Sequence, residues 1–229
     1  MLIALGVVIS PILRVEGMCP MAHLINIVCS VLLGPWYSLI CATLIGIIRM
    51  TLMGIPPLAL TGAVFGAFLS GVFYRLSKGK IICAVLGEVI GTGLIGAVVS
   101  YPVMRFIMGR EGLGWVFYIP SFVAGTLIGG SIAYFFLRKL ADNGNLGKMQ
   151  KMLGSRVYAD KSSVLSTALT IAAFGAISFV VIEVVAGMFK LSAKATSIAA
   201  YSSMGAFALM AIVYFIIKKL GGNKVAADK

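Results

Sequence analysis

A few polar side chains interrupt long apolar runs and have the chemistry to bind a small polar molecule. His23 and Asn26 fall in "CPMAHLINIVCSVLLGPW", where a spacing of three residues places them on one face of a helix. Glu88 and Thr92 share a face in "CAVLGEVIGTG", and Arg49 ends the run "SLICATLIGIIR". A charge at the centre of a membrane helix costs about 2.5–3.5 kcal/mol, so such groups face the interior of a helix bundle and have a partner.

Aromatic residues extend this set where the fifth and sixth predicted helices meet the outer surface. A pocket with an aromatic wall and a few polar groups suits a small heteroaromatic ligand, whose ring stacks on Trp or Tyr. We therefore predict a ligand-binding set of eight residues, namely His23, Asn26, Arg49, Glu88, Thr92, Tyr101, Trp115 and Tyr118. The same residues also fit a structural ion pair, a packing histidine and an aromatic belt at the membrane surface.

The composition fixes the class of protein. Of the 229 residues 60% are hydrophobic and 11% are charged, whereas about 25% of the residues of a soluble domain are charged. Because no segment alternates like a barrel strand, the sequence predicts an all-α integral membrane protein. We expect about eight spans, at 1–13, 20–34, 35–54, 56–75, 81–108, 113–138, 164–189 and 196–217. Gly34-Pro35 separates the second span from the third.

The net charge of +12 is concentrated in short loops, which is a topology signal rather than a sign of nucleic-acid binding. One side carries most of the basic residues, including those of the loop 75–80, the segment 138–161 and the tail. This bias predicts a multi-pass protein of the cell membrane with both termini in the cytoplasm. The opposite side carries far fewer basic residues in its loops, namely Arg14, Arg105, Arg110, Lys190 and Lys194.

Other functional signatures are missing from the sequence. The four cysteines form no C-x-x-C pair and there is one histidine, so we expect neither a metal site nor a cofactor. No phosphate loop occurs, and no G-x-S-x-G element accompanies His23 as a base, so no catalytic residue is predicted. A proton-coupled secondary transporter remains the alternative, with Glu88 and Glu183 as the titrating groups.

Stripes of small residues allow helices to approach closely in lipid. They recur every four residues in "TGAVFGAFLSG", "GEVIGTG" and "AGTLIGGSIA". Packing within the bundle and docking to another membrane protein both fit such stripes. Gly6 and Ser10 on the first span are the candidates for partner docking, because an end helix is easily placed on the outside.

Three stretches together resemble the ThiW family, namely "CPMAHLINIVCSVLLGPWYSLICATLIGIIR", "PPLALTGAVFGAFLSGVFYRL" and "GEVIGTGLIGAVVSYP". The resemblance covers about residues 1–140. It implies the substrate-binding (S) component of an energy-coupling factor (ECF) transporter, with six helices and a pocket open to the outside. It also implies a coupling membrane protein and two ATPase subunits as partners. The ligand it implies is hydroxyethylthiazole, a precursor of thiamine.

The chain departs from this pattern after the sixth span. We predict a six-helix substrate-binding domain at 1–140, a basic cytoplasmic linker at 141–163 and a two-helix membrane hairpin with a basic tail at 164–229. Glu183 lies inside the seventh predicted span. The hairpin fits a brace for the bundle or a further docking element.

Overall fold

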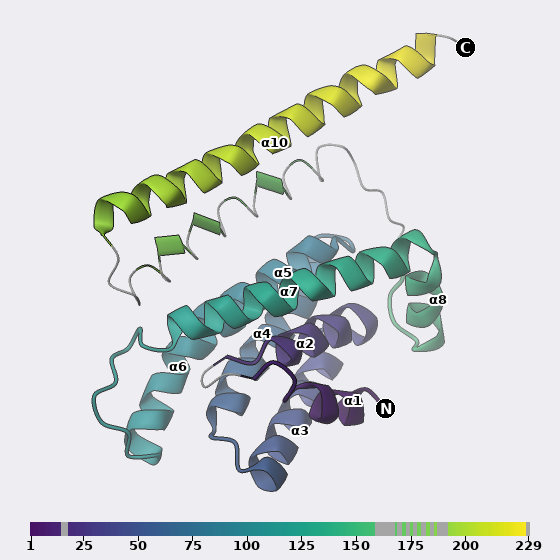
Figure 1. The fold of residues 1–229 in the computed structure, drawn as a ribbon. Coiled ribbons are helices and arrows are strands. Elements are labelled where there is room, and N and C mark those ends of the chain that lie inside the picture. Colours follow the sequence, from purple (N-terminus) through teal and green to yellow (C-terminus); the bar gives the residue numbers. More distant parts are fainter. Residues whose placement is uncertain are drawn as a thin grey trace. The chain divides into compact units, whose positions relative to one another are not determined.

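The computed structural model describes residues 1–14, 18–158 and 192–227, and within 159–191 only 168, 171, 172, 175, 178, 179, 182, 183 and 186. The chain divides into two compact units, Met1–Asp160 and Lys161–Lys229, and each is described by itself. Every element of these residues is helical, so the predicted all-α class is confirmed (Figure 1).

The first unit contains ten helical segments among its described residues. They are α1 (Leu2–Ile9), α2 (Pro20–Leu33), α3 (Pro35–Met53), α4 (Leu58–Leu76), α5 (Ile81–Glu88), the π-helical η1 (Val89–Gly96), α6 (Ala97–Pro102), the π-helical η2 (Val103–Ile107), α7 (Ile119–Asp142) and α8 (Asn145–Met152). Helix α2 is central, because it packs against α3, α4, α5 and α7. Nearly all of its side chains are buried, which explains a helix that is apolar on most of its circumference.

Glycine and proline set the helix ends where the sequence predicts them. Gly34 ends α2 with a φ of 88°, and Pro35 is the first residue of α3, where its missing N–H costs nothing. Gly54 closes α3 in the left-handed conformation, with a φ of 61°, and donates its N–H to the carbonyl of Arg49. The predicted boundary between the second and third spans is confirmed.

The predicted fifth span is a composite helix. Residues Ile81–Ile107 form 27 continuous helical residues in which η1 and η2 replace α-helical turns. The glycines of the Gly91-Thr92-Gly93 stretch lie inside η1. A π-helical turn contains extra residues, so it rotates the side chains that follow it, and such turns are frequent at functional sites.

Small residues hold this composite helix against α4. A Cβ atom placed on Gly87 would lie 2.5 Å from the carbonyl oxygen of Leu69, and one on Gly91 would lie 2.5 Å from that of Phe65. Neither backbone can retreat without breaking the helix pair. The glycine stripes of α4 and of the composite helix therefore serve packing within the bundle.

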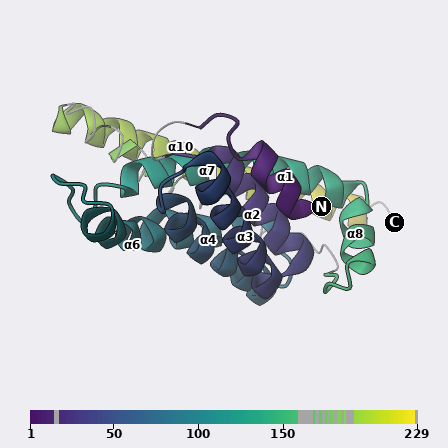
Figure 2. The same cartoon turned by 90° about the horizontal axis from the view of Figure 1, so that it is seen from below.

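The two ends of the first unit differ. Helix α8 lies at the C-terminal end of α7, whereas α6 lies at the opposite end, as two perpendicular views show (Figures 1 and 2). Gln150 attaches α8 to the bundle, because its Nε2 donates to the carbonyl oxygen of Val31 at 2.9 Å and to Tyr74 Oη at 3.0 Å. The segment 141–163, predicted as a linker, thus contains a helix that packs on the bundle.

Two predicted spans differ from the helices observed. Helix α1 has only 8 residues, which reach about 12 Å and cannot cross a bilayer. Helix α7 begins at Ile119 rather than near residue 113, because Gly114 and the residues after it form turns. The first predicted span is therefore too long and the sixth begins too early.

The second unit contains α10 (Ala193–Ala227), which includes the eighth predicted span. Ser178 and Ser203 share a hydrogen bond of 2.8 Å, and the rings of Phe179 and Tyr201 are 5.0 Å apart. Most of the seventh predicted span, 164–189, lies outside the described residues.

Five helices in the described part of the chain are long and apolar enough to cross a membrane. They are Pro35–Met53, Leu58–Leu76, Ile81–Ile107, Ile119–Asp142 and Ala193–Ile217, and α2 is a shorter apolar helix. This finding agrees with a multi-pass membrane protein.

Candidate ligand-binding site

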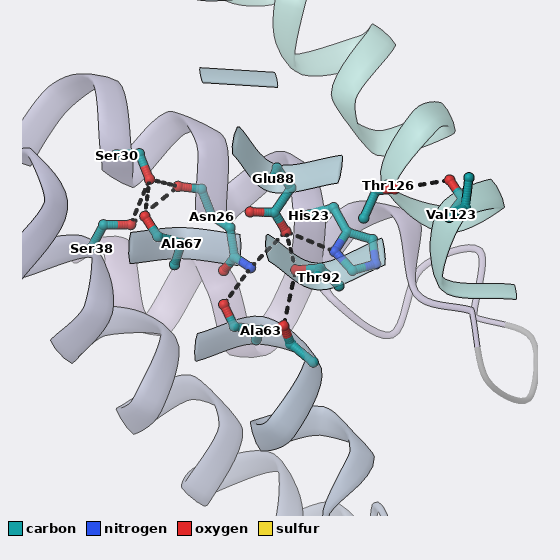
Figure 3. A network of polar contacts seen from close by, with 11 residues as sticks. His23, Asn26, Ser30, Ser38, Ala63, Ala67, Glu88, Thr92, Val123 and Thr126 are labelled. Carbon is teal, nitrogen blue, oxygen red and sulfur yellow. Dashed lines mark hydrogen bonds and ion pairs between the residues drawn. The ribbon is translucent and has the colours of Figure 1, made fainter. Parts of the chain in front are cut away.

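Glu88 is the centre of a buried polar network (Figure 3). Its side chain has no exposed surface. His23 Nδ1 lies 2.9 Å from Glu88 Oε1, and Asn26 Nδ2 donates to the same oxygen at 3.0 Å. Thr92 Oγ1 is also 3.0 Å from this oxygen and 2.9 Å from the carbonyl oxygen of Gly62. The four predicted residues His23, Asn26, Glu88 and Thr92 are thus brought together.

The local sequence explains how this network fits between helices. His23 and Asn26 are one turn apart on α2, and Glu88 and Thr92 are one turn apart across the junction of α5 and η1. A Cβ atom on Gly66 would lie 2.6 Å from Glu88 Oε2. Gly66 on α4 therefore leaves the space that the carboxyl group occupies.

A second layer of polar groups continues along α2 (Figure 3). Ser30 Oγ lies 2.7 Å from the carbonyl oxygens of both Asn26 and Ala67, and 2.8 Å from Ser38 Oγ. Both serines have no exposed surface. This layer joins α2, α3 and α4 through hydrogen bonds that lipid cannot supply.

A cavity of about 510 Å³ lies beside the Glu88 network, within the size range of small-molecule sites. Its wall includes the side chains of His23, Thr92, Arg49 and Phe122. The N-terminal parts of α2, α4 and α7 and the C-terminal part of α3 meet around it, so it lies at the end of the bundle away from α8. Asn26 and Glu88 support the wall from behind rather than line it.

Arg49 reaches the cavity from near the C-terminal end of α3. Its side chain is 3% exposed, and its Nη2 donates to Cys19 Sγ at 3.2 Å. Its Nε has no hydrogen-bond partner among the described residues. Cys19 in turn lies 2.9 Å, by its Sγ, from the carbonyl oxygen of Ser10.

The predicted aromatic residues gather in a cluster that borders the cavity through Phe122. Tyr101 and Tyr118 are buried with Met104 and Phe122, and the Tyr101 and Trp115 rings are 4.5 Å apart. Trp115 is 59% exposed. Tyr101, Trp115 and Tyr118 are not part of the cavity wall, and the ring that lines it belongs to Phe122.

The wall residues that the sequence reasoning missed include an aromatic residue and two basic ones, Phe122, Arg14 and Arg110. The arginines carried a signal, because they are basic residues on the side that the charge bias leaves nearly empty. Phe122 carried none, since one phenylalanine among thirteen in an apolar chain does not stand out.

The candidates for partner docking face the bundle. Ser10 is 1% exposed, and its hydroxyl donates to the carbonyl oxygen of Gly6. A Cβ atom on Gly6 would collide with Ile45. Both residues use their small size for contacts with neighbouring helices, and docking at these two positions stays a prediction. The described residues contain no group of three His, Cys, Asp or Glu side chains that would hold a metal ion.

The model of a family described as thiamine-precursor transporter protein (ThiW) matches residues 1–143. The chain belongs to the ThiW family. It is therefore a thiamine-precursor transporter and a multi-pass membrane protein. The comparisons with curated proteins and with solved structures gave no match.

The ThiW match covers α1 to α7 and ends at the residue after α7. The Glu88 network and all wall residues of the cavity lie inside the matched range. Helix α8 and the second unit lie outside it. The part of the chain that the family defines is therefore the part that holds the cavity.

Proposed function

We propose that this ThiW protein is the substrate-binding S component of an ECF transporter and that it binds hydroxyethylthiazole. The observation that carries the proposal is the cavity of about 510 Å³, which combines the Phe122 ring with the polar groups of His23 and Thr92. The phenyl ring suits a thiazole ring. A histidine and a hydroxyl group suit a ring nitrogen and an alcohol.

The position of the cavity supports binding from the outside. The basic loop with Arg75, Lys78 and Lys80 and the basic helix α8 lie at the other end of the bundle. By the positive-inside bias that end faces the cytoplasm, and the cavity then opens to the exterior. Reporter fusions at Lys161 and Lys229 test this orientation, and a signal from an exterior-dependent reporter at either site would contradict it.

Ligand binding is tested by titration calorimetry of the purified protein with hydroxyethylthiazole. We expect His23→Ala to weaken binding about 5- to 150-fold, since an unsatisfied buried ligand group costs about 1–3 kcal/mol. Glu183→Gln is the matched control, because Glu183 belongs to the second unit and its affinity should equal that of the wild type. Native mass spectrometry of the untreated protein identifies any ligand that is carried through purification.

Energy coupling separates this proposal from a second candidate. The 229 residues contain no phosphate loop, so the S component is expected to bind ligand and to need partner ATPases for uptake. The contact of His23 with Glu88 favours proton-coupled transport instead, because buried acid and imidazole groups form proton relays in membranes. Concentrative uptake by the chain alone in liposomes with a proton gradient would support the second candidate. Uptake only with the ATPase module would support the first.

A further inference from the structure

Arg49 is a buried cation without a counter-ion among the described residues. No carboxylate of these residues forms an ion pair with it. Among the described residues its one polar partner is the thiol of Cys19, which is a weak acceptor, and its Nε has no partner there. Buried charges in proteins are normally paired and hydrogen-bonded, because their desolvation is costly. The part of the chain that the structure describes therefore provides no group that would balance this guanidinium, which is 3% exposed.

The rest of the cavity wall has the same sign. Arg14 and Arg110 line the cavity together with Arg49, and no aspartate or glutamate is among the described residues of the wall. The three arginines come from separate parts of the chain, namely the segment before α2, the end of α3 and the loop after η2. They also lie at the end of the bundle that the topology bias leaves poor in basic residues. The charge bias that orients membrane proteins does not explain basic residues at this end of the bundle. An anion bound in the cavity would explain them.

Glu88 does not supply the missing charge. It is not part of the cavity wall, and its Oε1 is already occupied by the contacts with His23, Asn26 and Thr92. The wall thus contains three cationic side chains, Arg14, Arg49 and Arg110, together with neutral groups such as Thr92 and Phe122.

We propose that the cavity selects a ligand with an anionic group, a phosphate ester or a carboxylate, which Arg49 binds with Arg14 and Arg110 beside it. A guanidinium offers its Nε and Nη donors side by side, which matches two oxygens of such an anion. This inference rests on the proposed function for the identity of the ring and adds the charge of its side chain. Under it, the cavity binds a charged derivative of the thiazole more tightly than the neutral alcohol.

Three ligands with one ring test the proposal by calorimetry on the full chain in detergent. They are hydroxyethylthiazole, its phosphate monoester and the thiazole acetate in which a carboxylate replaces the alcohol carbon. We expect one of the two anions to bind at least about tenfold more tightly than the alcohol, because charge-assisted hydrogen bonds are the stronger ones. The tighter of the two identifies the anion. In Arg49→Gln this preference should disappear, and Arg49→Lys should restore part of it.

The melting temperature of the ligand-free protein tests whether Arg49 has only a structural role. Without ligand, Arg49→Gln should melt at or above the wild-type temperature, because it removes an unbalanced buried charge. A clear loss of stability would mean that the chain itself pairs Arg49 and would overturn the proposal. Glu16, the nearest acid in the sequence, lies outside the described residues. Anion binding that appears only in Glu16→Gln would likewise overturn it.

The remaining outcomes separate the two proposals. If the alcohol binds as tightly as both anions in wild type and in Arg49→Gln, the anion inference fails and the proposed thiazole site stands. If no thiazole binds but inorganic phosphate binds in an Arg49-dependent manner, the anion inference stands and the proposed ring fails. If none of these probes binds to the folded protein, both fail.

Discussion

Glu88→Gln tests the buried network most directly, because it changes the charge and the donors of one group while keeping its shape. In the native chain Glu88 Oε1 meets Nδ1 of His23 and Nδ2 of Asn26, and Oε2 has no hydrogen-bond partner. A glutamine must place its NH₂ group at one of these two positions. At Oε2 this NH₂ group finds no acceptor, and at Oε1 it faces the NH₂ group of Asn26, which is another donor, beside His23 Nδ1 and Thr92 Oγ1.

The size of the effect follows from these positions. One buried amide without an acceptor costs about 1–3 kcal/mol. The weaker hydrogen bonds to an uncharged oxygen add to this cost. For a chain of 150–250 residues, 1 kcal/mol corresponds to about 2–4 °C in melting temperature. We therefore expect Glu88→Gln to lower the Tm by about 2–12 °C.

Thermal unfolding in detergent, followed by circular dichroism, measures the change. Glu183→Gln is the matched control, since it is the same substitution in the second unit at a side chain that is only partly buried. Its stability should stay within about 0.5 kcal/mol of the wild type. If Glu88→Gln melts like the wild type or above it while the control is silent, the network as described does not stabilise the bundle.

Two further substitutions test the packing. Gly87→Ala should destabilise the protein by about 1–3 kcal/mol in the same melting assay, because its Cβ would lie 2.5 Å from a carbonyl oxygen of α4. Gly205→Ala is its control. Because Gly205 has open space around it, this substitution should be neutral or stabilising. Gln150→Ala should speed hydrogen–deuterium exchange in α8, because it removes the contacts of α8 with Val31 and Tyr74. The exposed Met152→Ala is its control, and equal exchange in both would contradict the attachment.

The helix boundaries were predictable because glycine and proline act locally. Gly34-Pro35 must end one helix and begin another, whatever surrounds it. The i, i+4 relation of Glu88 and Thr92 was equally local and appears as a contact of 3.0 Å. Placing His23, Asn26 and Glu88 in one candidate set followed from the cost of a polar group in an apolar helix, which favours grouping of such residues, but their direct contacts were not predicted.

The aromatic wall was not predictable in the same way. The sequence shows Tyr101, Trp115 and Tyr118 near one predicted surface, but two features decide where their rings point. The π-helical turns of η1 rotate the end of the fifth helix, and the turns after residue 113 delay the start of α7. Both features depend on tertiary packing, so they cannot be predicted from the 3.6-residue periodicity of apolar residues in the sequence.

Because Glu88 lies behind His23, the affinity losses caused by substituting these two residues should not be additive. If Glu88 acts by fixing the His23 ring, removing both groups costs no more affinity than removing His23 alone. If Glu88 itself touches the ligand, the losses of His23→Ala and Glu88→Gln add. Because Glu88 does not line the cavity, we expect the non-additive result in a double-mutant cycle of binding affinities. Additive losses would place the carboxyl group in contact with the ligand and would mean that the bound cavity reaches deeper than the one described.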